Sequence, residues 1–131
     1  GSEMCIRDSA GAVLAARPNT GVDLLMGIGG TPEGVIAACA MRCLGGEIQS
    51  MFAPQSDEER DLASSIDLNR VFTSEDLVKG DDIFFAATGI TDGELLDGVR
   101  FTERCMTSQS LVMRAKSHTI RVISSEHPHR Y

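Results

Sequence analysis

The chain has 131 residues, of which 42% are hydrophobic and 24% charged, a composition typical of one globular domain with a buried core. Acidic residues outnumber basic ones 19 to 12, and the resulting net charge of −7 disfavours nucleic acids as partners. No apolar run approaches the roughly 20 residues that a membrane-spanning helix needs. We therefore expect a cytoplasmic protein that binds neither nucleic acid nor membrane.

The first third of the chain is predicted to contain a helix, a strand and a second helix. Small residues predict a short helix over 10–16, which the turn-forming residues 17–21 end. The apolar run 22–28 predicts a buried strand. Residues 32–44 predict a helix, and the glycine pair that follows it is a typical helix terminator.

The middle of the chain is predicted to be less regular. Alternating residues 47–52 predict a strand. Residues 56–66 predict a charged surface helix, because Ser56 followed by Glu59 matches a capping box. A shorter helix is expected over 74–78.

The last third of the chain is predicted to be mainly strands. Residues 82–87 are too apolar for a half-exposed strand, and the small residues 88–93 form a loop after it. Strands are expected at 99–101, 107–116 and 119–124, joined by turns. Because helices and strands alternate early in the chain, we expect a largely parallel or mixed sheet with an antiparallel end. The predicted fold class is therefore α/β, a layered mixed sheet with packed helices.

The segment Gly27-Ile28-Gly29-Gly30-Thr31-Pro32-Glu33-Gly34 joins the predicted strand to the predicted helix. A strand, a glycine turn and a helix in this order point unpaired backbone N–H groups at an anion. We expect Thr31 as N-cap, Pro32 at the first helical position and Glu33 in the first turn. Glu33 would repel a phosphate unless a cation lay between them, which favours a metal-assisted phosphate site. The alternative is that Glu33 only complements the helix dipole.

Two better-known phosphate-binding loops do not fit this segment. The P-loop has a Lys-Ser/Thr pair at its last glycine, whereas Val35 follows Gly34. The dinucleotide-binding pattern G-x-G-x-x-G fails because Pro32 stands where its third glycine would be.

The four cysteines lack C-x-x-C spacing, so we interpret them as small buried residues of a reduced protein rather than as metal ligands. They are Cys5, Cys39, Cys43 and Cys105.

Several ordered strings resemble the class II fructose-1,6-bisphosphatases: residues 27–35, then 43–49, 84–93 and 107–114. The similarity extends over about residues 10 to 126. This family belongs to the metal-dependent, lithium-sensitive sugar phosphatases, which are layered α/β proteins. Its members remove the 1-phosphate of fructose 1,6-bisphosphate, and some also that of sedoheptulose 1,7-bisphosphate.

The resemblance implies that Glu33 is a ligand of Mn²⁺ or Mg²⁺ and that the backbone of Gly30 contacts the sugar phosphate. It also implies a substrate-binding acid upstream of Gly30, where this chain has Asp8. The family's other metal-binding acids, and its basic and tyrosine substrate contacts, lie in an amino-terminal half that this chain does not contain. We therefore assign no catalytic residue and expect no useful phosphatase activity from these 131 residues alone.

The expected domain organisation has three parts. Residues 1–9 match nothing that follows, and we interpret them as a tag or artefactual leader. Residues 10–126 are expected to form the carboxy-terminal α/β domain of a sugar bisphosphatase, the second half of a sugar-phosphatase-like sandwich, and residues 127–131 a tail. We expect such a domain to expose apolar residues and to self-associate through them. These residues are Leu24, Leu25, Ile83, Phe84 and Phe85.

Two alternative functions stay open at this point. One is a non-catalytic module that binds phosphate or another anion at residues 27–34. The other is an inositol-phosphate-type phosphatase of the same superfamily, although the strings at 88–93 and 109–114 favour the sugar bisphosphatase. In the leading interpretation the partner is a small sugar bisphosphate, and the complete enzyme is expected to be a homo-oligomer.

Overall fold

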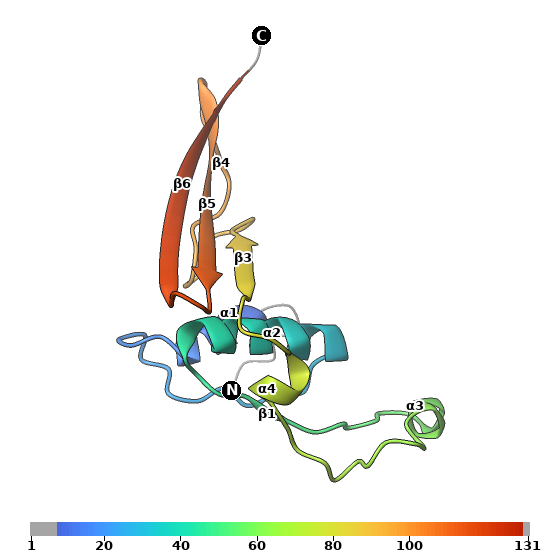
Figure 1. Cartoon of the computed structure of the whole chain (residues 1–131). Helices are drawn as coiled ribbons and strands as arrows, with labels where there is room; N and C mark the ends of the chain where they lie inside the picture. The colour runs from blue at the N-terminus through green and yellow to red at the C-terminus, as the bar shows by residue number, and fades with distance from the viewer. Residues whose placement is uncertain (1–7, 130–131) are drawn as a thin grey trace.

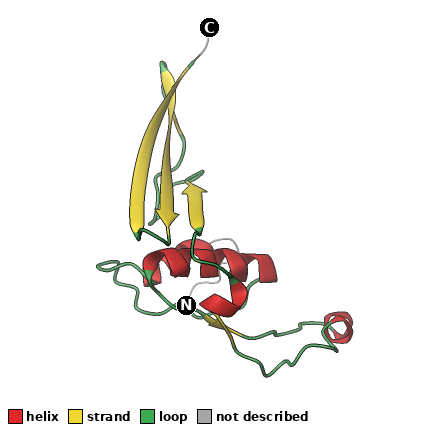
Figure 2. Cartoon of the chain, viewed as in Figure 1, coloured by secondary structure: helices red, strands yellow, loops and turns green. Residues whose placement is uncertain are grey.

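The structure, a computed structural model, describes residues 8–129, with helices at one end and a sheet rising from them (Figure 1, Figure 2). This combination confirms the predicted α/β class. The elements in chain order are α1 (Asp8–Ala15), α2 (Thr31–Leu44), β1 (Gln49–Ser50), α3 (Asp57–Leu62), β2 (Phe72–Thr73), α4 (Ser74–Leu77), β3 (Phe84–Thr88), β4 (Arg100–Phe101), β5 (Cys105–Arg114) and β6 (Thr119–Pro128).

Strand β5 organises the larger sheet. It pairs with β6 over its whole length, with Arg114 opposite Thr119, and with β3 over its second half, with Arg114 opposite Phe84. The short β4 pairs with the first half of β5. All of the strand pairs among residues 8–129 are antiparallel, so the predicted parallel pairing is wrong. It depended on a strand at 22–28, and the structure has none there.

Helices α1 and α2 pack at the end of this sheet where β3 begins and β5 ends, and they form the core with it (Figure 1). Leu111 and Met113 of β5 and Val13 of α1 have no exposed surface. Helix α2 contributes mostly small side chains, which let the elements approach closely. The core consists of Ala12, Val13, Ala37, Ala40, Met41, Cys43, Ile83, Phe85, Leu96, Leu111, Met113 and Ala115.

Strand β3 is covered on one face only, so the prediction that it is too apolar to be half-exposed is wrong. Phe85 points into the core and is 7% exposed, whereas Phe84 points to the other face and is 62% exposed. Ile83, also expected to be uncovered, is buried. The guanidinium of Arg114 lies 4.9 Å from the centre of the Phe84 ring and covers part of it.

The predicted helices are largely confirmed. Those expected at 10–16, 32–44 and 74–78 correspond to α1, α2 and α4. Helix α2 ends as predicted, at Gly45, whose φ of 74° is left-handed. The charged helix predicted over 56–66 is shorter in the structure, where it is α3 and ends at residue 62. None of the helices among residues 8–129 is long and apolar enough to cross a membrane.

An arm extends away from the body of the molecule between β1 and β2 (Figure 1). The strand predicted at 47–52 is reduced to β1, which pairs with β2 through only two residues on each side. At this base the Phe52 and Phe72 rings meet edge to face, with 5.4 Å between their centres. Helix α3 lies near the tip, where the hydroxyl of Ser56 accepts from the N–H of Glu59 at 3.1 Å. The Glu59 carboxylate accepts from the N–H of Gln55 at 2.7 Å, not from that of Ser56 as in a capping box.

The loop after β3 folds back tightly on itself. The N–H of Gly98 donates to the Asp92 carboxylate at 2.9 Å, and Arg100 donates to the same oxygen at 3.2 Å. A Cβ on Gly98 would lie 2.6 Å from the carbonyl carbon of Thr91 and 2.6 Å from the nitrogen of Asp92. Both contacts are with backbone, which cannot move aside as a flexible side chain can.

Gly98→Ala is therefore expected to destabilise the fold by about 2 to 3 kcal/mol, through overpacking. Chemical denaturation followed by circular dichroism would measure this change. The matched control is Gly93→Ala in the same loop, where the nearest atom to an added Cβ is the Leu96 oxygen at 3.9 Å. The control should change stability by less than about 0.5 kcal/mol, and equal effects of the two substitutions would contradict the packing of this loop.

Candidate functional site

The glycine-rich segment leads into the first turn of α2, as predicted. Gly30 is the N-cap, with φ −69° and ψ 157°, and Pro32 lies in the first turn. The prediction that Thr31 is the N-cap is wrong, because the helix begins one residue earlier and Thr31 is already helical. Since Gly30 has no side chain, the cap forms no side-chain hydrogen bond, and the positive end of the helix is open to solvent.

Glu33 lies in the first turn of α2, as predicted, and its side chain folds back over Gly30. A Cβ built on Gly30 would collide with Oε2 of Glu33 and would lie 3.3 Å from its Cδ. Glycine at position 30 therefore leaves room for this carboxylate. Both residues are exposed, so the carboxylate is accessible to a cation or a ligand.

The other ligands of a metal centre are not among the residues described. Residues 8–129 contain no group of three or more His, Cys, Asp or Glu side chains that could hold a metal ion. Mg²⁺ and similar cations take about six oxygen ligands. Glu33 alone therefore does not fit a complete divalent metal centre, and the role of Glu33 as a metal ligand stays a prediction.

The structure brings Gly30 and Glu33 together but does not test Asp8. Asp8 is the first residue of α1, and its side chain is not among those that the structure describes. Among the surface pockets of the described residues, one of about 370 Å³ lies along residues 15–23 and another of about 540 Å³ lies at the other end of α2. Neither is lined by Gly30 or Glu33.

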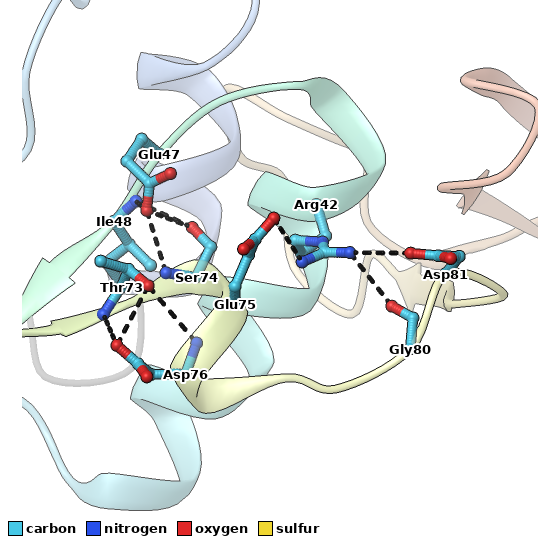
Figure 3. Close-up of polar contacts among 9 residues, drawn as sticks. All are labelled: Arg42, Glu47, Ile48, Thr73, Ser74, Glu75, Asp76, Gly80 and Asp81. Atoms are coloured by element: carbon cyan, nitrogen blue, oxygen red, sulfur yellow. Dashed lines mark hydrogen bonds and ion pairs between the residues drawn. The ribbon is translucent and has the colours of Figure 1, made fainter.

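The larger pocket adjoins a polar cluster that sequence reasoning missed (Figure 3). The Glu47 carboxylate accepts from the Ser74 N–H at 2.9 Å, the Ser74 hydroxyl at 2.8 Å and the Ile48 N–H at 3.1 Å. Chiefly because of the Ser74 hydrogen bonds, the pKa of Glu47 is lower than its ordinary value of 4.5. This cluster fixes the start of α4 against the chain that leaves α2.

Arg42 holds the other side of this pocket (Figure 3). Its guanidinium donates to the Gly80 carbonyl at 3.1 Å and lies 3.5 Å from Glu75 and 3.4 Å from Asp81. As a cation in the last turn of α2, Arg42 also complements the helix dipole. Charges of both signs line this pocket, and the groups around Glu47 and Arg42 bond one another. We therefore interpret this polar cluster as structural.

The prediction that the cysteines are buried holds for Cys43 but not for Cys39 and Cys105, which are half-buried. Cys39, Cys43 and Cys105 are free, and Cys43 is 1% exposed. Burial raises the pKa of Cys39 and of Cys43, which keeps both thiols protonated at neutral pH. Cys5 lies outside the described residues.

The Glu47 cluster generates a pH-dependence prediction. A carboxyl with a lowered folded-state pKa stabilises the fold above its unfolded pKa, and this stabilisation is lost as pH falls through the folded pKa. The stability of the wild-type chain should therefore fall more steeply below pH 4.5 than that of Glu47→Gln. Thermal unfolding measured at pH 3 to 7 would show the difference. Glu94→Gln, at an exposed loop position, is the control, and identical pH profiles for the wild type and Glu47→Gln would contradict the prediction.

Comparison with known proteins identifies related sequences along nearly the whole chain. Residues 6–127 match the family described as bacterial fructose-1,6-bisphosphatase, glpX-encoded. This match includes Asp8 and part of the segment interpreted as an artefactual leader, an interpretation that stays untested.

Three curated relatives each align with 92% of the chain. The class 2 fructose-1,6-bisphosphatase of Haemophilus influenzae is 41% identical over 135 residues, and the fructose-1,6-bisphosphatase 2 class 2 of Escherichia coli is 35% identical. The D-fructose 1,6-bisphosphatase class 2/sedoheptulose 1,7-bisphosphatase of a Synechococcus species is 37% identical. The chain spans 40%, 42% and 39% of the lengths of these three proteins.

Proposed function

The chain belongs to the bacterial class 2 fructose-1,6-bisphosphatase family, and from this premise we propose that it contributes to hydrolysis of the 1-phosphate of fructose 1,6-bisphosphate. The observation that carries the proposal is the family match over residues 6–127, which includes the whole glycine-rich segment and α2. The names of the relatives favour a sugar bisphosphatase over an inositol-phosphate-type enzyme. The name of the Synechococcus relative supports sedoheptulose 1,7-bisphosphate as a second substrate.

Within this function, Glu33 is proposed as one ligand of Mn²⁺ or Mg²⁺. Its exposed carboxylate and its place in the first turn of α2 support this role. A divalent cation bound there would supply Lewis-acid chemistry toward a phosphoryl group. Gly30 is proposed to bind the sugar phosphate through its backbone. A larger residue at position 30 would collide with the Glu33 carboxylate and displace it, which would block this binding. Asp8 is proposed as a second substrate contact, and its inclusion in the family match supports it.

The 131 residues alone are expected to be inactive, because residues 8–129 bring no group of carboxylates to Glu33, whereas a metal centre needs several ligands. Loss of outer-shell partners alone costs a metal site about 10- to 100-fold in affinity or activity. We therefore expect phosphate release from fructose 1,6-bisphosphate with Mn²⁺ at least about 100-fold slower than by the complete H. influenzae relative. A colorimetric phosphate assay on both proteins would measure this. Mn²⁺-dependent release by the chain at a comparable rate would overturn the expectation.

The alternative of a plain anion-binding module can be separated from a metal site by one substitution. If Glu33 is a metal ligand, Glu33→Gln should abolish most of the weak Mn²⁺ binding expected of the wild-type chain, and calorimetry would measure both proteins. If the segment only binds anions, Glu33→Gln should bind inorganic phosphate as well as the wild type or better, because a repulsive charge is removed.

The matched control for this substitution is Glu58→Gln. Glu58 is likewise exposed and lies in the first turn of α3. Equal loss of Mn²⁺ binding in Glu33→Gln and Glu58→Gln would assign the effect to net charge and remove Glu33 from the proposed site.

A further inference from the structure

Helices α1 and α2 run in the same direction and lie side by side. In Figure 1 the chain enters both helices from the same side of the molecule and leaves both at the other. Two consecutive helices joined by a short loop are antiparallel neighbours, whereas a parallel pair needs a connection that returns along the whole pair. Residues 16–30, which contain no helix or strand, are this connection. The amino ends of both helices therefore lie at one end of the pair.

A close contact joins the two helices at their carboxyl ends. Ala16 continues the last turn of α1, because its N–H donates to the Ala12 carbonyl at 3.2 Å. The Gly46 N–H donates to the Met41 carbonyl at 3.1 Å, just after the end of α2. A Cβ built on Gly46 would lie 3.1 Å from the Cβ of Ala16 and 3.1 Å from Sδ of Met41. Glycine at this position therefore lets α1 approach α2 more closely than any other residue would.

The two adjacent glycines after α2 serve different purposes. Gly45 has a φ of 74°, and an added Cβ would meet no atom within 4 Å, so it is the backbone conformation that requires glycine there. Gly46 is not among the described glycines with positive φ, so a larger residue could adopt its backbone conformation. What position 46 requires is space beside Ala16.

The register of this contact determines what lies at the other end of the helix pair. Ala16 is eight residues after Asp8, and Met41 is eight residues after Glu33. At a rise of about 1.5 Å per residue, each helix extends about 12 Å from the contact to its first turn. The first turn of α1 therefore lies at the same level as the first turn of α2.

We propose that Gly46 is a positioning residue for the site at the amino end of α2. By setting the separation of the two helices at their carboxyl ends, it holds the first turn of α1, which begins at Asp8, beside Glu33. A larger side chain at position 46 would shift the backbone of α1 and move its first turn away from Glu33. The alignment of the helices rests on the contacts above, whereas its part in phosphate hydrolysis rests on the proposed function.

The experiment measures the separation of the two first turns by nuclear magnetic resonance. A nitroxide label at Thr31→Cys, in a chain whose four native cysteines are replaced by alanine, speeds the relaxation of nearby amide protons. We expect enhanced relaxation at residues 9–12 of this labelled chain. Gly46→Val should lower the enhancement at least about twofold through the backbone shift that overpacking causes, and Gly46→Ala should lower it less. Combining Ala16→Gly with Gly46→Val makes room for the added side chain and should restore part of the enhancement.

The matched control is Gly45→Ala, which strains a left-handed residue and lowers stability without placing an atom against α1. It should leave the enhancement at residues 9–12 unchanged. Equal losses in Gly45→Ala and Gly46→Val would assign the effect to lost stability and overturn the proposal. Absence of enhancement at residues 9–12 in the labelled chain with both glycines in place would overturn it as well.

A second measurement separates this proposal from the proposed function. In the wild-type chain, a small amount of Mn²⁺ replaces the nitroxide as the paramagnetic probe. Enhanced relaxation at residues 31–34 and 9–12, with a loss at residues 9–12 alone in Gly46→Val, would support both proposals. Enhancement at residues 31–34 alone would support Glu33 as a metal ligand and overturn the positioning role. If Mn²⁺ affects neither helix while the nitroxide results hold, the proposed function fails and the alignment of the helices by Gly46 stands.

Discussion

The contact between α2 and the sheet is the interaction on which the remainder of the structure depends. Leu111 and Met113 are completely enclosed, and the alanines of α2 are small enough for the helix backbone to lie close to them. This packing fixes the axis of α2, and with it both of its ends. At one end lie Gly30 and Glu33, and at the other Arg42 reaches the chain before β3.

The two ends of α2 have opposite electrostatic character. They also differ in how far their polar groups are hydrogen-bonded or ion-paired within the described chain. At the carboxyl end, Arg42 meets carboxylates and a carbonyl, and Glu47 accepts hydrogen bonds from its neighbours. At the amino end the cap has no side-chain partner, and Glu33 is exposed. The carboxyl end is therefore complete within this chain, whereas the amino end offers a charge and free N–H groups for something else to bind. A binding role is easier to assign to an end whose groups are not already paired.

Local sequence signals predicted the helices well and the strand pairing poorly. Helix caps and the left-handed conformation of Gly45 depend on residues that are close together in the sequence. The sequence alone could therefore place α2 and α4. Pairing depends on residues that are distant along the chain. Residues 22–28 have the pattern of a strand but no described partner. Phe84 is a large apolar residue typical of a core, yet it lies on a face where the Arg114 guanidinium covers only part of its ring. The motif at Gly30 and Glu33 was found because it is contiguous, whereas Glu47 and Ser74, 27 positions apart, could be linked only by the fold.

The arm between β1 and β2 has a consequence for how this region tolerates change. Because two residue pairs and one aromatic contact close its base, the length of chain between them has little influence on the packing of α2 against the sheet. A loop that closes at a fixed base loses little free energy when residues are added, since the entropic cost grows only with the logarithm of its length. The tip near α3 is accordingly the place to insert a fluorescent label or an epitope without disturbing the core.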